Sequence, residues 1–162
     1  MGASQVPVRS ASIWAQIATS SLSGVSNVSF TSIPNYSELL ISWKSTYTLG
    51  YGELLRIRFN SDTGSNYSYL FTDNTAPIVS SGTATSIGMG SLSSNSSPTN
   101  SGSVLIKGSN DIYKTITFNN TAAAINGAGD WFNSASITSI SFIGSTGGGT
   151  FTAGTVTLYG RS

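Results

Sequence analysis

The sequence of 162 residues contains no cysteine and no histidine. Without cysteine, the chain can form neither a disulfide nor a thiolate metal site. Without histidine, it lacks the commonest general base and the commonest transition-metal ligand of proteins. We therefore expect a protein that is not an enzyme, that binds no cofactor and that holds no metal.

Charged residues are also scarce, at 8% of the chain, against about 25% in an ordinary soluble domain. Serine, threonine, asparagine and glycine take their place, so the surface lacks the long charged side chains that resist association. Lysine and arginine together number only seven, and the net charge is +1. A nucleic-acid partner is not expected, because such binding depends on basic side chains that neutralise phosphates. The composition instead favours packing against other protein.

Long apolar runs are missing too. No segment approaches the roughly 18 apolar residues that indicate a transmembrane helix, so no membrane partner is expected. Residues 1–12 contain one arginine and no apolar stretch, which predicts a polar N-terminal arm and no signal peptide. From residue 13 to residue 162 the composition and the strand-like pattern do not change, which predicts a single domain.

Alternation of apolar and polar residues with period two dominates this domain and predicts β-strands. In Leu39–Thr46, for example, Trp43 falls on the apolar face, where we expect it to pack in the core. The predicted strands are Ile13–Thr19, Val25–Ile33, Leu39–Thr46, Leu55–Phe59, Tyr67–Phe71, Ser103–Lys107, Tyr113–Asn119, Ile137–Ile143 and Thr155–Tyr159. About nine or ten short strands with frequent turns predict an all-β fold, a two-sheet antiparallel β-sandwich that is jelly-roll-like.

One segment does not fit this strand pattern. Residues 80–102 are rich in serine, glycine and asparagine, and Ile87, Met89 and Leu92 are their only apolar anchors. We predict a long loop here, and loops of this length in a compact domain usually serve a function or move.

Acidic side chains are the remaining candidates for catalysis, because two carboxylates suffice for a glycosidase. The six are Glu38, Glu53, Asp62, Asp73, Asp111 and Asp130. The two glutamates open or precede strands and the four aspartates lie in turn-like contexts, so we expect structural or solvated roles. The segment Asn60–Asn66 has oxygen side chains at alternate positions, as Ca²⁺ prefers, but only one carboxylate. We predict a tight hairpin loop there rather than a calcium site.

Aromatic residues could stack on sugar rings if they were exposed. Trp131 lies beside glycine in Gly129-Asp130-Trp131-Phe132, and Tyr47 and Tyr51 flank Leu49-Gly50. These three residues could face outward, and they are the candidates for a glycan-binding site.

Several segments together resemble a group of tailed-bacteriophage virion proteins. They are Phe30-Thr31-Ser32-Ile33-Pro34, Leu39-Leu40-Ile41, the stretch from Leu55-Arg56-Ile57-Arg58-Phe59 through Asn60-Ser61-Asp62-Thr63-Gly64-Ser65-Asn66-Tyr67, Ile137-Thr138-Ser139-Ile140 and Leu158-Tyr159-Gly160. The resemblance covers most of the chain outside residues 1–12 and 80–102. Its motifs mark strands and a turn, so they assign no functional residue.

The resemblance implies a virion structural protein. The main expectation is a capsid decoration (cement) protein, a homotrimer on the capsid surface that binds and stabilises the major capsid protein lattice. The arm 1–12 would then become ordered on a neighbouring subunit. The alternative is a receptor- or glycan-binding module of a tail fibre or tail tip, with Tyr47, Tyr51 and Trp131 as its candidate contacts.

Overall fold

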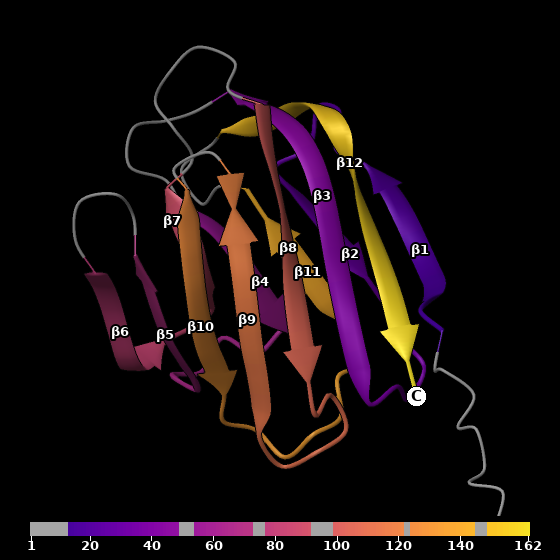
Figure 1. Ribbon diagram of the computed structural model, residues 1–162, viewed down its shortest axis with the longest axis vertical. Coiled ribbons are helices and arrows are strands. Elements are labelled where there is room, and N and C mark those ends of the chain that lie inside the picture. Colours follow the sequence, from indigo (N-terminus) through magenta and orange to yellow (C-terminus); the bar gives the residue numbers. More distant parts are fainter. Residues whose placement is uncertain (1–12, 49–53, 73–76, 92–98, 122–123, 145–148) are drawn as a thin grey trace, which may run out of the picture.

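Two antiparallel β-sheets lie face to face in a computed structural model of the chain (Figure 1). The structure describes residues 13–48, 54–72, 77–91, 99–121, 124–144 and 149–162. Its strands are β1 (Ala15–Ser21), β2 (Asn27–Phe30), β3 (Glu38–Thr48), β4 (Leu54–Phe59), β5 (Tyr67–Thr72), β6 (Pro77–Ala84), β7 (Ile87–Ser91), β8 (Thr99–Lys107), β9 (Lys114–Asn120), β10 (Ile125–Trp131), β11 (Ile140–Ile143) and β12 (Thr150–Arg161). The predicted all-β, two-sheet sandwich is confirmed, with more strands than expected.

The large sheet has eight strands in the order β1-β12-β3-β8-β9-β10-β5-β6, and the small sheet has four in the order β2-β11-β4-β7. Strands from the two ends of the chain pair inward: β1 with β12, β2 with β11, β3 with β8 and β4 with β7. This wrapped-hairpin pairing of eight strands is that of a jelly roll, as the sequence predicted. The hairpins β5–β6 and β9–β10 are additions that widen the large sheet beyond β8.

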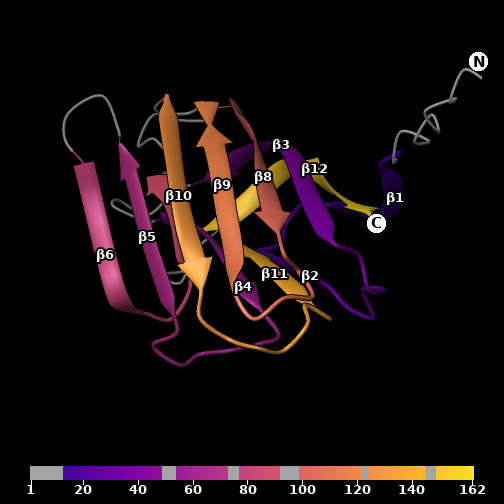
Figure 2. The ribbon, with the colours of Figure 1, turned by 60° about the horizontal axis from the view of Figure 1, so that its bottom comes forward.

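The hydrophobic core lies between the sheets, on the faces that the period-two alternation predicts. In β4, Leu55, Ile57 and Phe59 are fully buried while the two arginines between them are partly exposed. Figure 2 shows the large sheet in front, with β4, β11 and β2 behind it. Trp43, whose core position was predicted, packs on Phe142 with ring centroids 5.3 Å apart.

The prediction of a loop over residues 80–102 is wrong. This stretch holds the end of β6, all of β7 and the beginning of β8, and residues 92–98 lie outside the described residues. The small side chains let large neighbours approach: a Cβ on Gly88 would lie 2.9 Å from the Tyr69 ring, and Ile87 and Met89 are fully buried. The predicted arm, residues 1–12, also lies outside the described residues.

Strand β10 was missed because two of the four inward positions in its sequence Ile-Asn-Gly-Ala-Gly-Asp-Trp are glycines, which are depleted in strands. A Cβ on Gly127 would meet the Phe118 ring at 2.3 Å, and one on Gly129 would meet the Ser68 carbonyl oxygen at 2.5 Å. The two glycines therefore make room for neighbours inside a sheet, where the sequence suggested a loop.

Candidate functional site

The aromatic residues proposed for glycan binding do not form an exposed cluster. Trp131 is 0% exposed and Tyr47 is 1% exposed, so the prediction of surface stacking residues is wrong for both. Tyr47 packs edge-on against Phe151 at 4.8 Å between ring centroids, and Trp131 ends the buried face of β10. Tyr51 lies outside the described residues. The glycines near Trp131 allowed close packing where the sequence suggested exposure.

The acidic side chains also have structural surroundings. Glu38, at the start of β3, forms an ion pair with Arg161. Asp62 and Asp111 lie in turns, as predicted, but Asp130 lies within β10, so the turn-like context predicted for it is wrong and only the solvated alternative stays open. Among the described residues, no three acidic side chains gather into a group that could hold a metal ion. Glu53 and Asp73 lie outside the described residues.

Asp62 is the centre of a hydrogen-bond network that joins the 60–66 turn to the end of β10. Its Oδ1 accepts the Gly64 N–H at 2.8 Å. Its Oδ2 accepts three more donors, which are the side chains of Asn66 at 2.9 Å, Trp131 at 2.8 Å and Asn133 at 3.3 Å. Burial alone would raise the pKa of Asp62, but these hydrogen bonds outweigh it and hold the pKa below its usual value.

This network argues against the calcium alternative for the turn. A cation needs oxygen ligands that point toward it, whereas N–H groups converge on the single carboxylate here. The segment Asn60–Asn66 therefore works as a structural turn, in line with the prediction of a tight loop.

Asn60 forms a second centre beside it. Its backbone is left-handed (φ 49°), which asparagine tolerates better than most residues. Its Oδ1 accepts the N–H groups of Thr138 and Ser139 at 2.8 and 3.0 Å, and its Nδ2 donates to the Ser136 carbonyl at 2.8 Å. Asn60 and Asp62 thus hold the connection between β10 and β11.

A buried lysine lies against this network and was not predicted. Lys114 is 0% exposed, its ammonium lies 5.1 Å from the centre of the Trp131 ring, and its Nζ donates to the Asn133 carbonyl. Burial lowers the pKa of Lys114, and the charge of Asp111 partly opposes that shift. The alternation of β9 does place Lys114 on the same face as the buried Ile116 and Phe118, so this period-two pattern was the signal that could have identified it.

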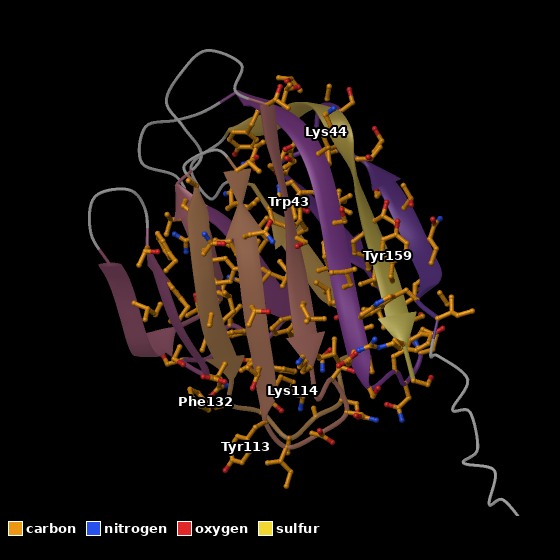
Figure 3. All side chains as sticks on the ribbon, in the orientation of Figure 1. Trp43, Lys44, Tyr113, Lys114, Phe132 and Tyr159 are labelled. Carbon is orange, nitrogen blue, oxygen red and sulfur yellow. The ribbon has the colours of Figure 1, made fainter. Side chains whose placement is uncertain are left out.

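The lower end of the large sheet in Figure 3 exposes large apolar side chains close to this lysine. Ile112 is 65% exposed, Tyr113 is 69% exposed and Phe132 is 48% exposed. Tyr113 and Phe132 each lie one residue beyond the paired positions Lys114 and Trp131, so they are neighbours at the ends of β9 and β10. We call these three residues the apolar end.

The outer face of the large sheet is the broadest surface of the molecule. Its side chains form transverse rows, because the register runs without interruption from β12 to β5. The polar row is Thr19, Thr157, Ser42, Ser103, Asn119, Asn126 and Thr72. The apolar row beside it is Gln16, Tyr159, Leu40, Leu105, Thr117, Ala128 and Leu70. The charged row, nearest the apolar end, is Arg161, Glu38, Lys107, Thr115, Asp130 and Ser68.

Hydroxyl and amide groups on this face bond to one another across strands. Thr19 and Thr157 share a hydrogen bond of 2.9 Å, and Asn119 Nδ2 donates to Ser103 Oγ at 2.9 Å. Toward the upper end, Thr46 and Thr152 do the same at 2.9 Å. Many polar groups of the outer face are therefore already paired within the chain.

A shallow depression of about 250 Å³ lies at the upper end of this face, where β12 carries a bulge. Its lining is Lys44, Ser45, Thr46, Thr99, Ala153, Gly154 and Thr155. Among the described residues, one ammonium and several hydroxyls line it, and no carboxylate does.

The sequence matches no protein-family model and no curated protein significantly. Within the described part of the chain, no helix is long and apolar enough to cross a membrane. The functional argument therefore proceeds from the surfaces and contacts of the jelly roll itself.

Proposed function

We propose that this chain is a structural protein of a tailed-phage virion, a capsid decoration protein that binds the major capsid protein through its apolar end. The observation that carries the proposal is the exposure of Ile112, Tyr113 and Phe132 together at one end of the jelly roll. Large apolar side chains gathered on a surface mark contact sites, and tyrosine is enriched among the residues that dominate interface energies.

The surroundings of the apolar end support a contact surface that is rigid before binding. Phe132 N–H donates to the Asn66 carbonyl at 2.8 Å, and the preceding Trp131 is anchored by Asp62. Tyr113 precedes the buried Lys114. Aromatic side chains on a fixed backbone lose little conformational freedom when a partner covers them, and this favours binding.

The resemblance to virion proteins supports the choice of the major capsid protein as partner. The scarcity of charged residues suits a surface that stays in contact with other subunits. The glycan-binding alternative has lost Tyr47 and Trp131 as exposed residues. A tail location would differ from the capsid in copy number, since a decoration protein is present in hundreds of copies per particle and a tail protein in a handful.

The proposal is tested by measuring how the chain binds to capsid shells from a phage in which the gene for this chain has been deleted. The full chain is mixed with purified shells and co-sedimented, and the double variant Tyr113→Ser/Phe132→Ser is compared with Ile13→Ser. Ile13 is 86% exposed just before the edge strand β1, which three strands separate from β9, and this makes it a matched apolar control. We expect the double variant to bind at least tenfold more weakly, because each aromatic contact contributes roughly 1–2 kcal/mol and about 1.4 kcal/mol is tenfold.

Three outcomes would contradict the proposal: that the wild-type chain does not bind shells, that the double variant binds as tightly as the wild type, or that the virion carries only a few copies of the protein. The last outcome would move the protein to the tail.

A further inference from the structure

The outer face of the large sheet has the area of a subunit interface. Beyond the polar row lies a fourth row, which holds Thr155, Lys44 and Ser101. Strands lie about 4.8 Å apart and successive rows about 6.8 Å apart, so four rows across the seven strands from β1 to β5 cover roughly 30 by 20 Å, or about 600 Å². Specific protein interfaces begin at about 600 Å² per partner. The face is therefore within the size range of a stable interface.

Apolar and charged side chains are distributed over this face as they are in protein interfaces. The apolar row crosses the middle of the sheet and carries Leu40, Leu105 and Tyr159, and Leu70 on β5 is 47% exposed. The ionic side chains Glu38, Lys107 and Asp130 stand in the row along one margin. An uncharged centre with a charged rim is typical of protein interfaces.

Several polar groups of this face would keep their hydrogen bonds if a partner covered it. The hydroxyl and amide pairs Thr19–Thr157, Ser103–Asn119 and Ser101–Thr121 are already hydrogen-bonded across strands. Burying a polar group is unfavourable chiefly when its hydrogen bonds are lost. The paired groups of the polar row keep theirs when water leaves.

From these observations we infer that the outer face of the large sheet binds a second copy of this chain, with a two-fold axis along the apolar row. Rotation about that axis places Leu40 and Leu105 against the same residues of the partner. It also brings each charged row over a polar row, so that Glu38 faces a serine and Asp130 faces an asparagine. No two like charges of these rows meet.

Other arrangements are less complementary. A two-fold axis parallel to the strands, centred on the sheet, would set Glu38 of one copy against Asp130 of the other, and like charges in contact oppose binding. The small sheet offers Arg56 and Arg58 side by side on the outward positions of β4, which would repel the same pair on a second copy. The result is a two-fold dimer in place of the trimer that the family resemblance implies.

Sedimentation velocity of the purified full chain tests this inference without any capsid. We expect a dimer in the wild type and a monomer in Leu105→Lys, because the axis brings the two new ammonium groups together in an apolar contact. Ser29→Lys is the matched control, since Ser29 is exposed on the outer face of the small sheet, and it should leave the dimer intact. Thermal unfolding monitored by circular dichroism shows whether each variant is folded.

A cross-linking experiment gives a second readout that does not depend on a destabilising charge. The chain has no cysteine, so Leu105→Cys places a single thiol on the predicted axis. Packed sheets lie about 10 Å apart, and a bis-maleimide of that span should join two copies of Leu105→Cys. It should leave Ser29→Cys monomeric.

A wild-type chain that sediments as a monomer at about 100 μM, a dimer that persists in Leu105→Lys, or cross-linking of Ser29→Cys as efficient as that of Leu105→Cys would overturn the inference. Because the measurements use the isolated protein, their failure leaves the capsid proposal intact, and a failure to bind capsids leaves the dimer intact.

Discussion

Removal of the Asp62 carboxylate is the sharpest test of how this fold is held together at its lower end. In Asp62→Ala the Trp131 indole N–H loses its acceptor, and Trp131 is 0% exposed, so water cannot easily replace the carboxylate. A buried donor left unpaired costs about 1–3 kcal/mol, and each hydrogen bond to a charged group contributes about 1.5–3 kcal/mol where solvent is excluded. The bonds from Asn66 and Gly64 contribute less, because the turn is exposed to water.

We therefore expect Asp62→Ala to lower the free energy of unfolding by about 3 kcal/mol, and Asp62→Asn by about half of that, because Asn keeps one acceptor oxygen. For a chain of this length, 1 kcal/mol corresponds to about 2–4 °C in Tm, so Asp62→Ala should melt about 6–12 °C lower. Urea unfolding followed by tryptophan fluorescence and circular dichroism measures the change. Asp111→Ala is the matched control, since Asp111 is an exposed turn aspartate.

The pH dependence of the free energy of unfolding is a second test of the Asp62 network. The folded state lowers the pKa of Asp62, so its contribution to stability is complete above the unfolded value of about 3.9 and is lost as the pH falls through the lower folded value. The stability difference between wild type and Asp62→Asn should thus shrink as the pH falls from about 4 through the lower folded pKa. A loss in Asp62→Ala no greater than in Asp111→Ala, or a difference independent of pH, would refute the reasoning.

Two further predictions concern the interior. Burial raises the pKa of Tyr67 to about 12, with a further contribution from the charge of Asp62. The unfolded tyrosine ionises near pH 10, so wild-type stability should fall between about pH 10 and pH 12, and urea unfolding should find a shallower decline in Tyr67→Phe. In Gly102→Ala the new Cβ would lie 2.2 Å from the Asn119 carbonyl oxygen and 2.5 Å from the Trp43 ring, and we expect a loss of about 2–4 kcal/mol. Gly24→Ala, with nothing within 4 Å and a φ of 73°, should lose only about 1 kcal/mol, and equal losses in the two variants would contradict the steric account.

Much of the fold could be predicted because β-strands with one buried face have a readable period. Leu55, Ile57 and Phe59 alternate with two arginines, and the structure buries the first set. Trp43 follows the same rule. The jelly-roll class followed from strand number and spacing. Of the added hairpins, strands β5 and β9 were predicted, while β6 and β10 were not.

The errors fall at strands in which glycines alternate with, or replace, larger side chains. Strands β7 and β10 contain glycines whose space is filled by Tyr69, Phe118 and other neighbours, so their sequences resemble loops. For the same reason Trp131 seemed exposed, although it is buried under Phe59 and Tyr67, with ring centroids 5.3 and 6.2 Å away. Local sequence cannot report packing that a distant strand supplies.

The sequence alone determined that this chain is a low-charge, all-β protein without cysteine or histidine, because composition and period two are properties of each segment by itself. Only the tertiary structure decided which polar and apolar residues share a surface. The rows across the large sheet join residues up to 143 positions apart, such as Gln16 and Tyr159, and they exist because the register of strand pairing is set by contacts between distant segments. The apolar end likewise brings Tyr113 beside Phe132 through the pairing of β9 with β10. The scarcity of charge was visible in the sequence, and the pairing of strands decided where that uncharged surface lies.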